Sequence, residues 1–261
     1  MPFKKKNLGK TGLQVPPFAI GGGYGAMPRI LDEAFESGLN TYFYAPFFPT
    51  YTPMTKWLRS RFPARRDEHI LITTSYFWRI PGALERTLKR HLSWLRADYI
   101  DVFMLGWIKS ADQERAFETL EKMKEKKLFK YIGISAHTRK LFPEVMKKFP
   151  VDVVMTRYNF AHRGAEKEVF PFVKKEGVIA FNALKHGRIL RKFRGWDESN
   201  GKFPTAAEAY RYALSNPAVH MCLAGPNRSA HVESLRQAMA AGPLDKKRIA
   251  DLSGLGDFIH G

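Results

Sequence analysis

Short apolar segments rich in β-branched and aromatic residues alternate with longer segments of helical periodicity along the chain. This alternation is typical of βα units, in which each strand of a parallel sheet is followed by a helix. The sequence therefore predicts a parallel sheet surrounded by helices. The expected strands cover residues 17–22, 40–45, 69–75, 99–105, 131–135, 151–156, 178–183 and 220–225.

The segments between these strands carry apolar residues three or four positions apart, as amphipathic helices do. Residues 81–95 make the clearest case, because leucines recur there on one face. The expected helices cover residues 27–38, 53–62, 81–95, 111–126, 138–148, 163–175, 204–215 and 229–240. Eight alternating pairs predict an α/β fold, a (β/α)8 TIM barrel with an eight-stranded parallel sheet, formed by residues 1–261 as a single domain. The polar segment 187–204 is expected to cross the mouth of the barrel.

Other features of the sequence exclude several classes of protein. No apolar run reaches the roughly 20 residues that cross a bilayer, and the amino terminus lacks the pattern of a signal peptide, so we expect a cytoplasmic protein. The single cysteine, Cys222, excludes an internal disulfide and a cysteine cluster, and its apolar neighbours predict a buried thiol. The histidine spacing indicates no metal site.

The chain is strongly basic. Lys+Arg 43 against Asp+Glu 25 gives a net charge of +18, which favours polyanions and phosphorylated small molecules. The basic residues are interleaved with acids and accompany no recognition motif, so we expect no specific nucleic acid and no membrane as partner. A small-molecule or phosphorylated ligand remains the expected partner. The charge leaves open whether the chain is a monomer or a homo-oligomer.

Seven segments together resemble the aldo-keto reductases. They are LGKTGLQV, IGGGYG, GLNTYFYAP, YIDVFMLGW, KYIGISAH, RYNF and LAGPNRSAHVESLRQA, and they follow one another in the order and spacing of that family. The resemblance spans nearly the whole chain. It implies a (β/α)8 barrel and the reduction of aldehydes and ketones with NADPH.

The resemblance also implies the position of the catalytic site. In the family a tyrosine donates a proton to the carbonyl oxygen, a lysine lowers the pKa of that tyrosine, an aspartate holds the lysine, and a histidine orients the substrate. No Asp or Glu occurs within 39–66, no Lys within 57–88 and no His within 97–136, so a small shift of register restores none of these three groups. We therefore predict that reduction by the family mechanism is lost. The four matching positions are Phe43, Phe48, Ser75 and Gly106.

Residues 38–51 contain no charged side chain and many aromatic rings. Alternation along the strand would send Phe43 to one face and Tyr42 and Tyr44 to the other. Two interpretations stay open: the rings fill the core, or they form a stacking site for a planar ligand. Tyr51, His137 and His186 could act as an acid or base, but none has a partner identifiable in the sequence. The predicted ligand pocket consists of Phe43, Phe48, Tyr51, Trp107 and His137.

The resemblance further implies an NADP(H) site. Ser135, Ala136 and Met155 stand where the family binds the nicotinamide amide, so two of its binding groups are missing, and Phe181 stands at the stacking position. The segment before the last expected helix could bind a phosphate through backbone N–H groups and an arginine. NADP(H) is therefore a possible cofactor. Its predicted binding residues are Phe181, Lys185, Arg188, Gly225, Asn227, Arg228 and Ser229.

Three hypotheses follow. The first is an aldo-keto reductase-like oxidoreductase by descent that still binds NADP(H), with carbonyl reduction lost or altered, that is, a pseudoenzyme or one with rebuilt catalysis. The alternative is a non-catalytic barrel that senses a ligand or binds a partner through its aromatic mouth. The third, a nucleic-acid binder, rests on net charge alone.

Overall fold

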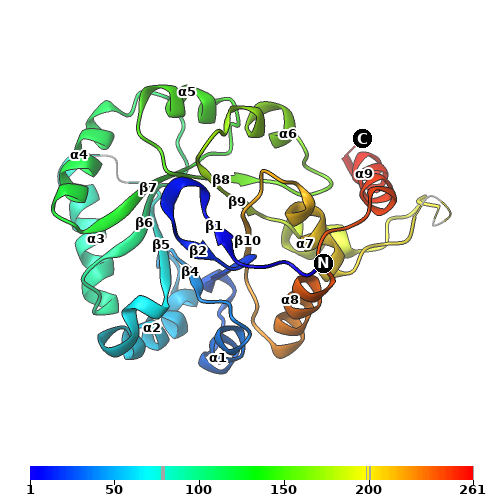
Figure 1. Cartoon of the computed structure of the whole chain (residues 1–261), viewed down its shortest axis with the longest axis horizontal. Coiled ribbons are helices and arrows are strands. Elements are labelled where there is room, and N and C mark those ends of the chain that lie inside the picture. The colour runs from blue at the N-terminus through cyan, green and yellow to red at the C-terminus, as the bar shows by residue number, and fades with distance from the viewer. Residues whose placement is uncertain (78–79, 198, 200, 261) are drawn as a thin grey trace.

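The computed structural model describes residues 1–77, 80–197, 199 and 201–260, and within them eight parallel strands close into a barrel (Figure 1). Each strand pairs with the next one along the chain, and β10 pairs with both β9 and β3. The predicted barrel and all eight predicted strands are confirmed. The strands are β3 (Phe18–Gly21), β4 (Thr41–Tyr44), β5 (Ile70–Ser75), β6 (Ile100–Leu105), β7 (Phe129–Ser135), β8 (Val153–Arg157), β9 (Gly177–Phe181) and β10 (Met221–Ala224).

Helices surround the barrel, as Figure 1 shows. The predicted helix over 163–175 is wrong as a continuous element, because it consists of the short α6 and a 3-10 turn, Phe170–Phe172, around Pro171. Proline lacks the N–H that a continuing helix would need. The surrounding helices are α1 (Pro28–Glu36), α2 (Thr52–Arg65), α3 (Pro81–Leu95), α4 (Glu114–Glu125), α5 (Leu141–Lys148), α6 (Ala165–Glu168), α7 (Ala206–Ser215) and α8 (Ser229–Ala241).

A further helix, α9 (Lys246–His260), was not predicted. The ring of Trp196 packs on Phe258 of α9 with ring centroids 5.4 Å apart, and its indole N–H donates to the Gly201 carbonyl over 2.7 Å. In Figure 1 the segment that follows Leu190 and α9 lie beside each other, outside the ring of helices. The expectation that 187–204 crosses the mouth is therefore wrong for the described residues after Leu190.

A hairpin covers the amino-terminal end of the barrel (Figure 1). It consists of β1 (Lys6–Asn7) and β2 (Gln14–Val15), and its Lys6 ammonium donates to the Val219 carbonyl over 2.5 Å. The same end holds two buried carboxylates. Asp101 pairs with Arg66 at 2.7 Å and Lys130 at 3.0 Å, while Asp152 pairs with Lys10 at 3.0 Å. The structure thus buries these carboxylates at the end far from the mouth.

The barrel interior is apolar, and β4 contributes to it through Phe43. The hydroxyl of Tyr44 lies 3.0 Å from that of Thr55 on α2, so Tyr44 faces the helices. Alternation turns Phe43 to the opposite face, where it is 3% exposed and pairs in register with Gly21 and Ile72. The predicted alternation is confirmed.

Two smaller findings complete the fold. Cys222 is fully buried and free, which confirms the expected buried thiol. Among the described residues, no helix combines the length and the apolar character needed to span a membrane.

Phe43→Asp is expected to lower the free energy of unfolding by about 3–5 kcal/mol, because a carboxylate would be buried without a cation in register. Phe43→Leu keeps the site apolar and should cost about 1 kcal/mol. Urea denaturation followed by circular dichroism measures both. Equal losses for the two variants would contradict the interior position of Phe43.

Candidate cofactor and ligand cleft

A cleft of about 620 Å³ opens at the carboxyl ends of the strands and extends to the start of α8. This volume is typical of a site for a small molecule or cofactor. None of the described residues that line it is Asp, Glu or Lys. The lining includes two groups of residues, one near the start of α8 and one at the mouth of the barrel. The α8 part comprises Gly225, Asn227, Arg228, His231 and Ser234, and the mouth part comprises Tyr51, Trp107, His137, Arg157 and Phe181.

The α8 part presents hydrogen-bond donors. Arg228 occupies the N-cap position of α8 without a capping bond from its side chain, so the first N–H groups of the helix lack that partner. The Arg228 guanidinium donates to Nε2 of His231 over 2.9 Å. Burial, and then the charge of Arg228, lower the pKa of His231, which favours the neutral imidazole that accepts this bond. An arginine beside a helix N-terminus is a site for an anion.

The remaining predicted phosphate-binding residues are placed differently. Ser229 donates to Glu33 of α1 over 2.9 Å, and it does not line the cleft. Lys185 and Arg188 lie in the 3-10 segment Lys185–Leu190 that borders the cleft, yet neither lines it. Of the predicted cofactor residues, the structure brings Phe181, Gly225, Asn227 and Arg228 together along one cleft.

A phenol and an imidazole join across the cleft wall. The hydroxyl of Tyr24, in the loop after β3, lies 2.5 Å from Nδ1 of His186, in the loop after β9. Both residues line the cleft. His186 has a φ of 55° and Lys185 a φ of 46°, a left-handed conformation that costs energy for residues other than glycine. The Tyr24–His186 contact is one interaction that ties this strained turn to the rest of the barrel.

The mouth part is largely aromatic. Trp107 lies 6.2 Å from His137 between ring centroids, and His137 meets Phe181 edge to face at 5.9 Å. Arg157 ends β8 and pairs in register with Phe181, so the two side chains share the inner face of the barrel. Burial, and then the charge of Arg157, lower the pKa of His137.

The four positions predicted to match the family tetrad are placed as follows. Phe43 is buried in the barrel interior, Phe48 is 54% exposed, and Ser75 is buried at the end of β5. None of the four lines the cleft, so Phe43 and Phe48 do not belong to the ligand pocket as predicted. At Gly106, a Cβ atom would come within 2.5 Å of both the Thr74 hydroxyl and the Tyr76 ring. The room that a histidine would need is therefore occupied.

Tyr51 is the phenol that does reach the mouth part. It follows the matching tyrosine position by three residues, lines the cleft and is 6% exposed. Burial raises the pKa of Tyr51 far above its ordinary value, and the nearby phenols Tyr76 and Tyr44 add to the rise. A tyrosine primed for proton donation needs the opposite shift, which a neighbouring ammonium would provide. No lysine lines the cleft.

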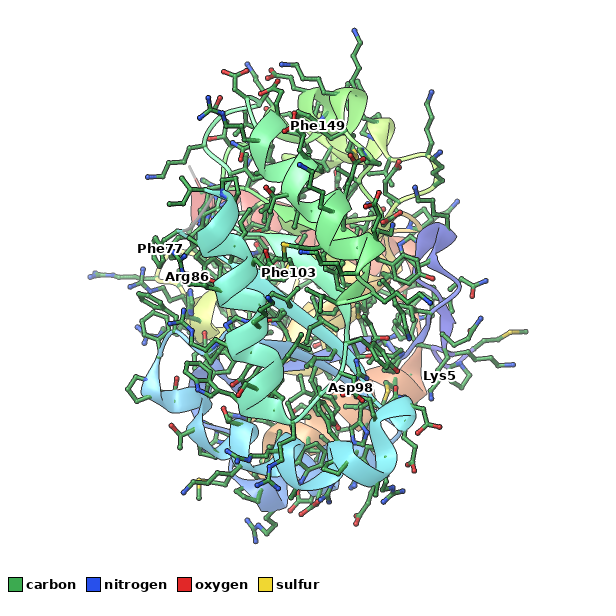
Figure 2. The ribbon with its side chains drawn as sticks, turned by 90° about the vertical axis from the view of Figure 1, so that its left-hand side faces the viewer. Lys5, Phe77, Arg86, Asp98, Phe103 and Phe149 are labelled. Carbon is green, nitrogen blue, oxygen red and sulfur yellow. The ribbon has the colours of Figure 1, made fainter. Side chains whose placement is uncertain are left out.

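Exposed rings extend from the mouth part across the rim. Phe47 meets Phe48 at 5.0 Å and Phe77 at 4.9 Å between centroids, and Phe77 meets Trp107 at 5.5 Å. We call Phe47, Phe48 and Phe77 the aromatic rim; each is about half exposed. Figure 2 shows Phe77 at the edge of the molecule opposite Lys5, which lies in the chain just before the hairpin. Exposed apolar patches of this kind commonly bind ligands or partners.

Tyr24, Arg157 and His231 line the cleft but were not predicted as site residues. The sequence could have identified Arg157, because it stands two residues after Met155 and alternation places both side chains on the inner face. Tyr24 contacts His186 in a distant loop, which no local pattern encodes, whereas His231 lies three residues after its hydrogen-bond partner Arg228.

Comparison with known proteins agrees with this architecture. The Aldo/keto reductase family model matches residues 27–195. An uncharacterized oxidoreductase of Bacillus subtilis, YqkF, is 21% identical over 96% of this chain and 95% of its own length. L-galactose dehydrogenase of Arabidopsis thaliana is 23% identical over 87% of this chain and 85% of its own.

Two solved structures share the fold. The holo form of aldo-keto reductase AKR11C1 from Bacillus halodurans has a TM-score of 0.84 at 22% identity, covering 97% of this chain and 96% of that one. An aldo/keto reductase from Klebsiella pneumoniae in complex with NADP and acetate has a TM-score of 0.81 at 20% identity, covering 97% and 95%. Because the family model covers more than half of the sequence, from the start of α1 through the loop after β9, this chain belongs to the aldo/keto reductase family.

Proposed function

We propose that this protein binds NADP(H) in the cleft, and that carbonyl reduction by a lysine-activated tyrosine is lost. The observation that carries the proposal is the contrast between the two parts of the cleft. The α8 part presents an arginine and a helix N-terminus. The tetrad positions hold two phenylalanines, a serine and a glycine, and none of them lines the cleft.

The residues present fit the phosphate-bearing half of NADP(H). Arg228 and the N-terminus of α8 would hold the 2′-phosphate, with Ser234 and His231 beside them. Gly225 packs so closely against the Tyr24 ring that a Cβ would lie 2.3 Å from it, so this wall of the cleft requires glycine. The Klebsiella relative, whose structure contains NADP, has the same fold.

The nicotinamide half fits less well. Phe181 offers a ring for stacking, and the Ser135 hydroxyl accepts from the Trp107 backbone N–H over 3.3 Å. Ala136 and Met155 stand where the family presents amide groups, so the carboxamide of a bound nicotinamide would lack these partners. Each missing hydrogen bond costs roughly 1–3 kcal/mol. We expect binding dominated by the phosphate end.

The chemistry that NADPH supplies is hydride transfer, and a carbonyl acceptor also needs a proton donor. Tyr51 has a pKa shifted in the wrong direction for that role. The aromatic rim favours a second candidate function, a barrel that binds a ligand or partner without turnover. NADPH binding without aldehyde reduction would be common to both candidates, and a partner that contacts Phe47 and Phe77 would favour the second.

The cofactor site is tested by titration of NADPH fluorescence. We expect NADPH to bind and Arg228→Ala to weaken it about ten- to a hundredfold, because a charge-assisted hydrogen bond to the 2′-phosphate is removed. NADH, which lacks this phosphate, should change little. Arg191→Ala removes an exposed charge outside the cleft and serves as the control. Equal weakening of NADPH and NADH would refute the assignment of Arg228.

The loss of catalysis is tested by following NADPH oxidation with 4-nitrobenzaldehyde. We expect turnover at least about 10²-fold below that of the Klebsiella pneumoniae relative assayed in parallel, because general acid catalysis is missing. The relative confirms that the assay detects reduction. Comparable rates for the two proteins would show that another group has taken over proton donation.

The crowding at Gly106 gives a separate prediction. Gly106→Ala should lower the free energy of unfolding by about 1–3 kcal/mol, because the new methyl group overlaps Thr74 and Tyr76. Gly82→Ala is the matched control. Among the described residues, its Cβ in α3 would meet only the end of the Arg86 side chain, at 3.3 Å, so this change should be neutral or stabilising. Similar stabilities for the two variants in urea denaturation would mean that the histidine position is still open.

A further inference from the structure

Arg157 is a cation of the mouth part without an assigned role. It is the last residue of β8, it is partly buried, and it lines the cleft. Among the described residues its guanidinium makes no hydrogen bond and no ion pair. Arginines elsewhere in the chain do pair, as Arg66 does with Asp101 at 2.7 Å and Arg248 with Glu208 at 2.8 Å.

The groups around Arg157 give it no anionic partner. Its nearest strand neighbour is Phe181, and His137 lies close enough for the charge of Arg157 to lower its pKa. His162, after β8, has a pKa lowered to about 4, by burial first and then by the charges of Arg157 and Lys185. The charge of Arg157 is the second cause of both shifts, after burial. Among the described residues that line the cleft, there is no Asp or Glu to balance this charge.

A partly buried guanidinium that lines a cleft is suited to bind an anionic ligand. Its planar array of donors matches a carboxylate or a phosphate in two-pronged geometry. Partial burial strengthens such a bond, because the local dielectric constant is lower than that of water. Tyr51 and Trp107 line the same part of the cleft, and their rings provide apolar faces for a flat ligand.

We propose that the mouth part binds a planar aromatic ligand that carries an anionic group, a carboxylate or a phosphate, and that Arg157 receives this group. The inference deepens the proposed function, since it names the class of the second ligand in a cleft whose α8 part holds NADP(H). In the barrel order, β9 separates β8, which ends with Arg157, from β10, which is followed by the segment that leads to Arg228. The two arginines therefore serve different anions.

Binding of matched probes to the protein without added cofactor tests the proposal by isothermal titration calorimetry. The probes are 4-acetylbenzoate, 4-acetylphenyl phosphate and the neutral methyl 4-acetylbenzoate, which share one planar body. We expect at least one anionic probe to bind tenfold or more tighter than the ester. The tighter of the two identifies the anionic group. Equal affinity for all three probes would overturn the proposal.

Substitutions of Arg157 test whether this residue causes the preference for the anionic probe. Arg157→Gln should abolish the preference for the anion, and Arg157→Lys, which keeps the charge without the planar fork, should retain part of it. Arg191→Gln removes the same charge from the exterior and should leave the preference intact. Thermal melts monitor folding, and the ester, which needs no cation, should bind Arg157→Gln as it binds the parent protein. A preference that survives in Arg157→Gln would refute the role of Arg157.

NADPH titration of the same variants separates this inference from the proposed function. Weakening of NADPH by Arg157→Gln as large as that by Arg228→Gln, with the probe preference unchanged, would place Arg157 in the cofactor site and overturn the inference alone. Failure of the parent protein to bind NADPH, with a probe preference that depends on Arg157, would overturn the proposed function and support the ligand class.

Discussion

Closure of the parallel sheet, where β10 pairs with both β9 and β3, determines where every residue of the cleft lies. Closure leaves no unpaired edge, and it brings the carboxyl ends of strands far apart in the sequence to one mouth. Tyr24 after β3 and Gly225 after β10 become neighbours because of this closure. The hairpin covers the other end, which also holds the buried carboxylates of Asp101 and Asp152 with their cations. Each end of the barrel thus has its own electrostatic character.

The proposed loss of the tetrad would have a physical reason to involve all four residues together. In the family mechanism the aspartate and lysine are a buried pair, and removing one partner leaves an uncompensated charge that costs about 3–5 kcal/mol. Replacing both by neutral groups avoids this cost. Phe43 now fills the barrel interior, and Thr74 and Tyr76 occupy the space beside Gly106. No lysine is among the described residues that line the cleft, and burial, followed by the nearby phenols Tyr76 and Tyr44, raises the pKa of Tyr51. The packing around Phe43 and Gly106 and the raised pKa of Tyr51 therefore both favour the proposed loss of the family mechanism.

The fold could be predicted from the sequence to a larger extent than the site. Strand and helix periodicity marks the barrel because each element buries one face, and this leaves a regular pattern. Helix α9 was not predicted, because Gly254 and Gly256 interrupt its apolar pattern and the helix packs on a loop. A Cβ atom on Gly256 would lie 2.0 Å from the Phe160 carbonyl oxygen. The Tyr24–His186 contact joins two loops 162 positions apart, and no local pattern encodes such a pairing. The alternation of β8, by contrast, would have placed Arg157 on the inner face.

The net charge of +18 does not by itself determine which anion the cleft binds. A basic surface attracts any anion, but this attraction falls off over roughly 10 Å at 0.1 M salt and does not distinguish one anion from another. Selection requires donors in fixed positions, and the cleft offers two, the exposed Arg228 at the start of α8 and the partly buried Arg157 at the end of β8. Aromatic rings line the same cleft, and none of its described lining residues is a carboxylate, so we expect it to favour ligands that combine flat apolar surface with negative charge. Under the proposed function, these arginines and rings would select the ligand of a cleft that does not reduce carbonyls by the family mechanism.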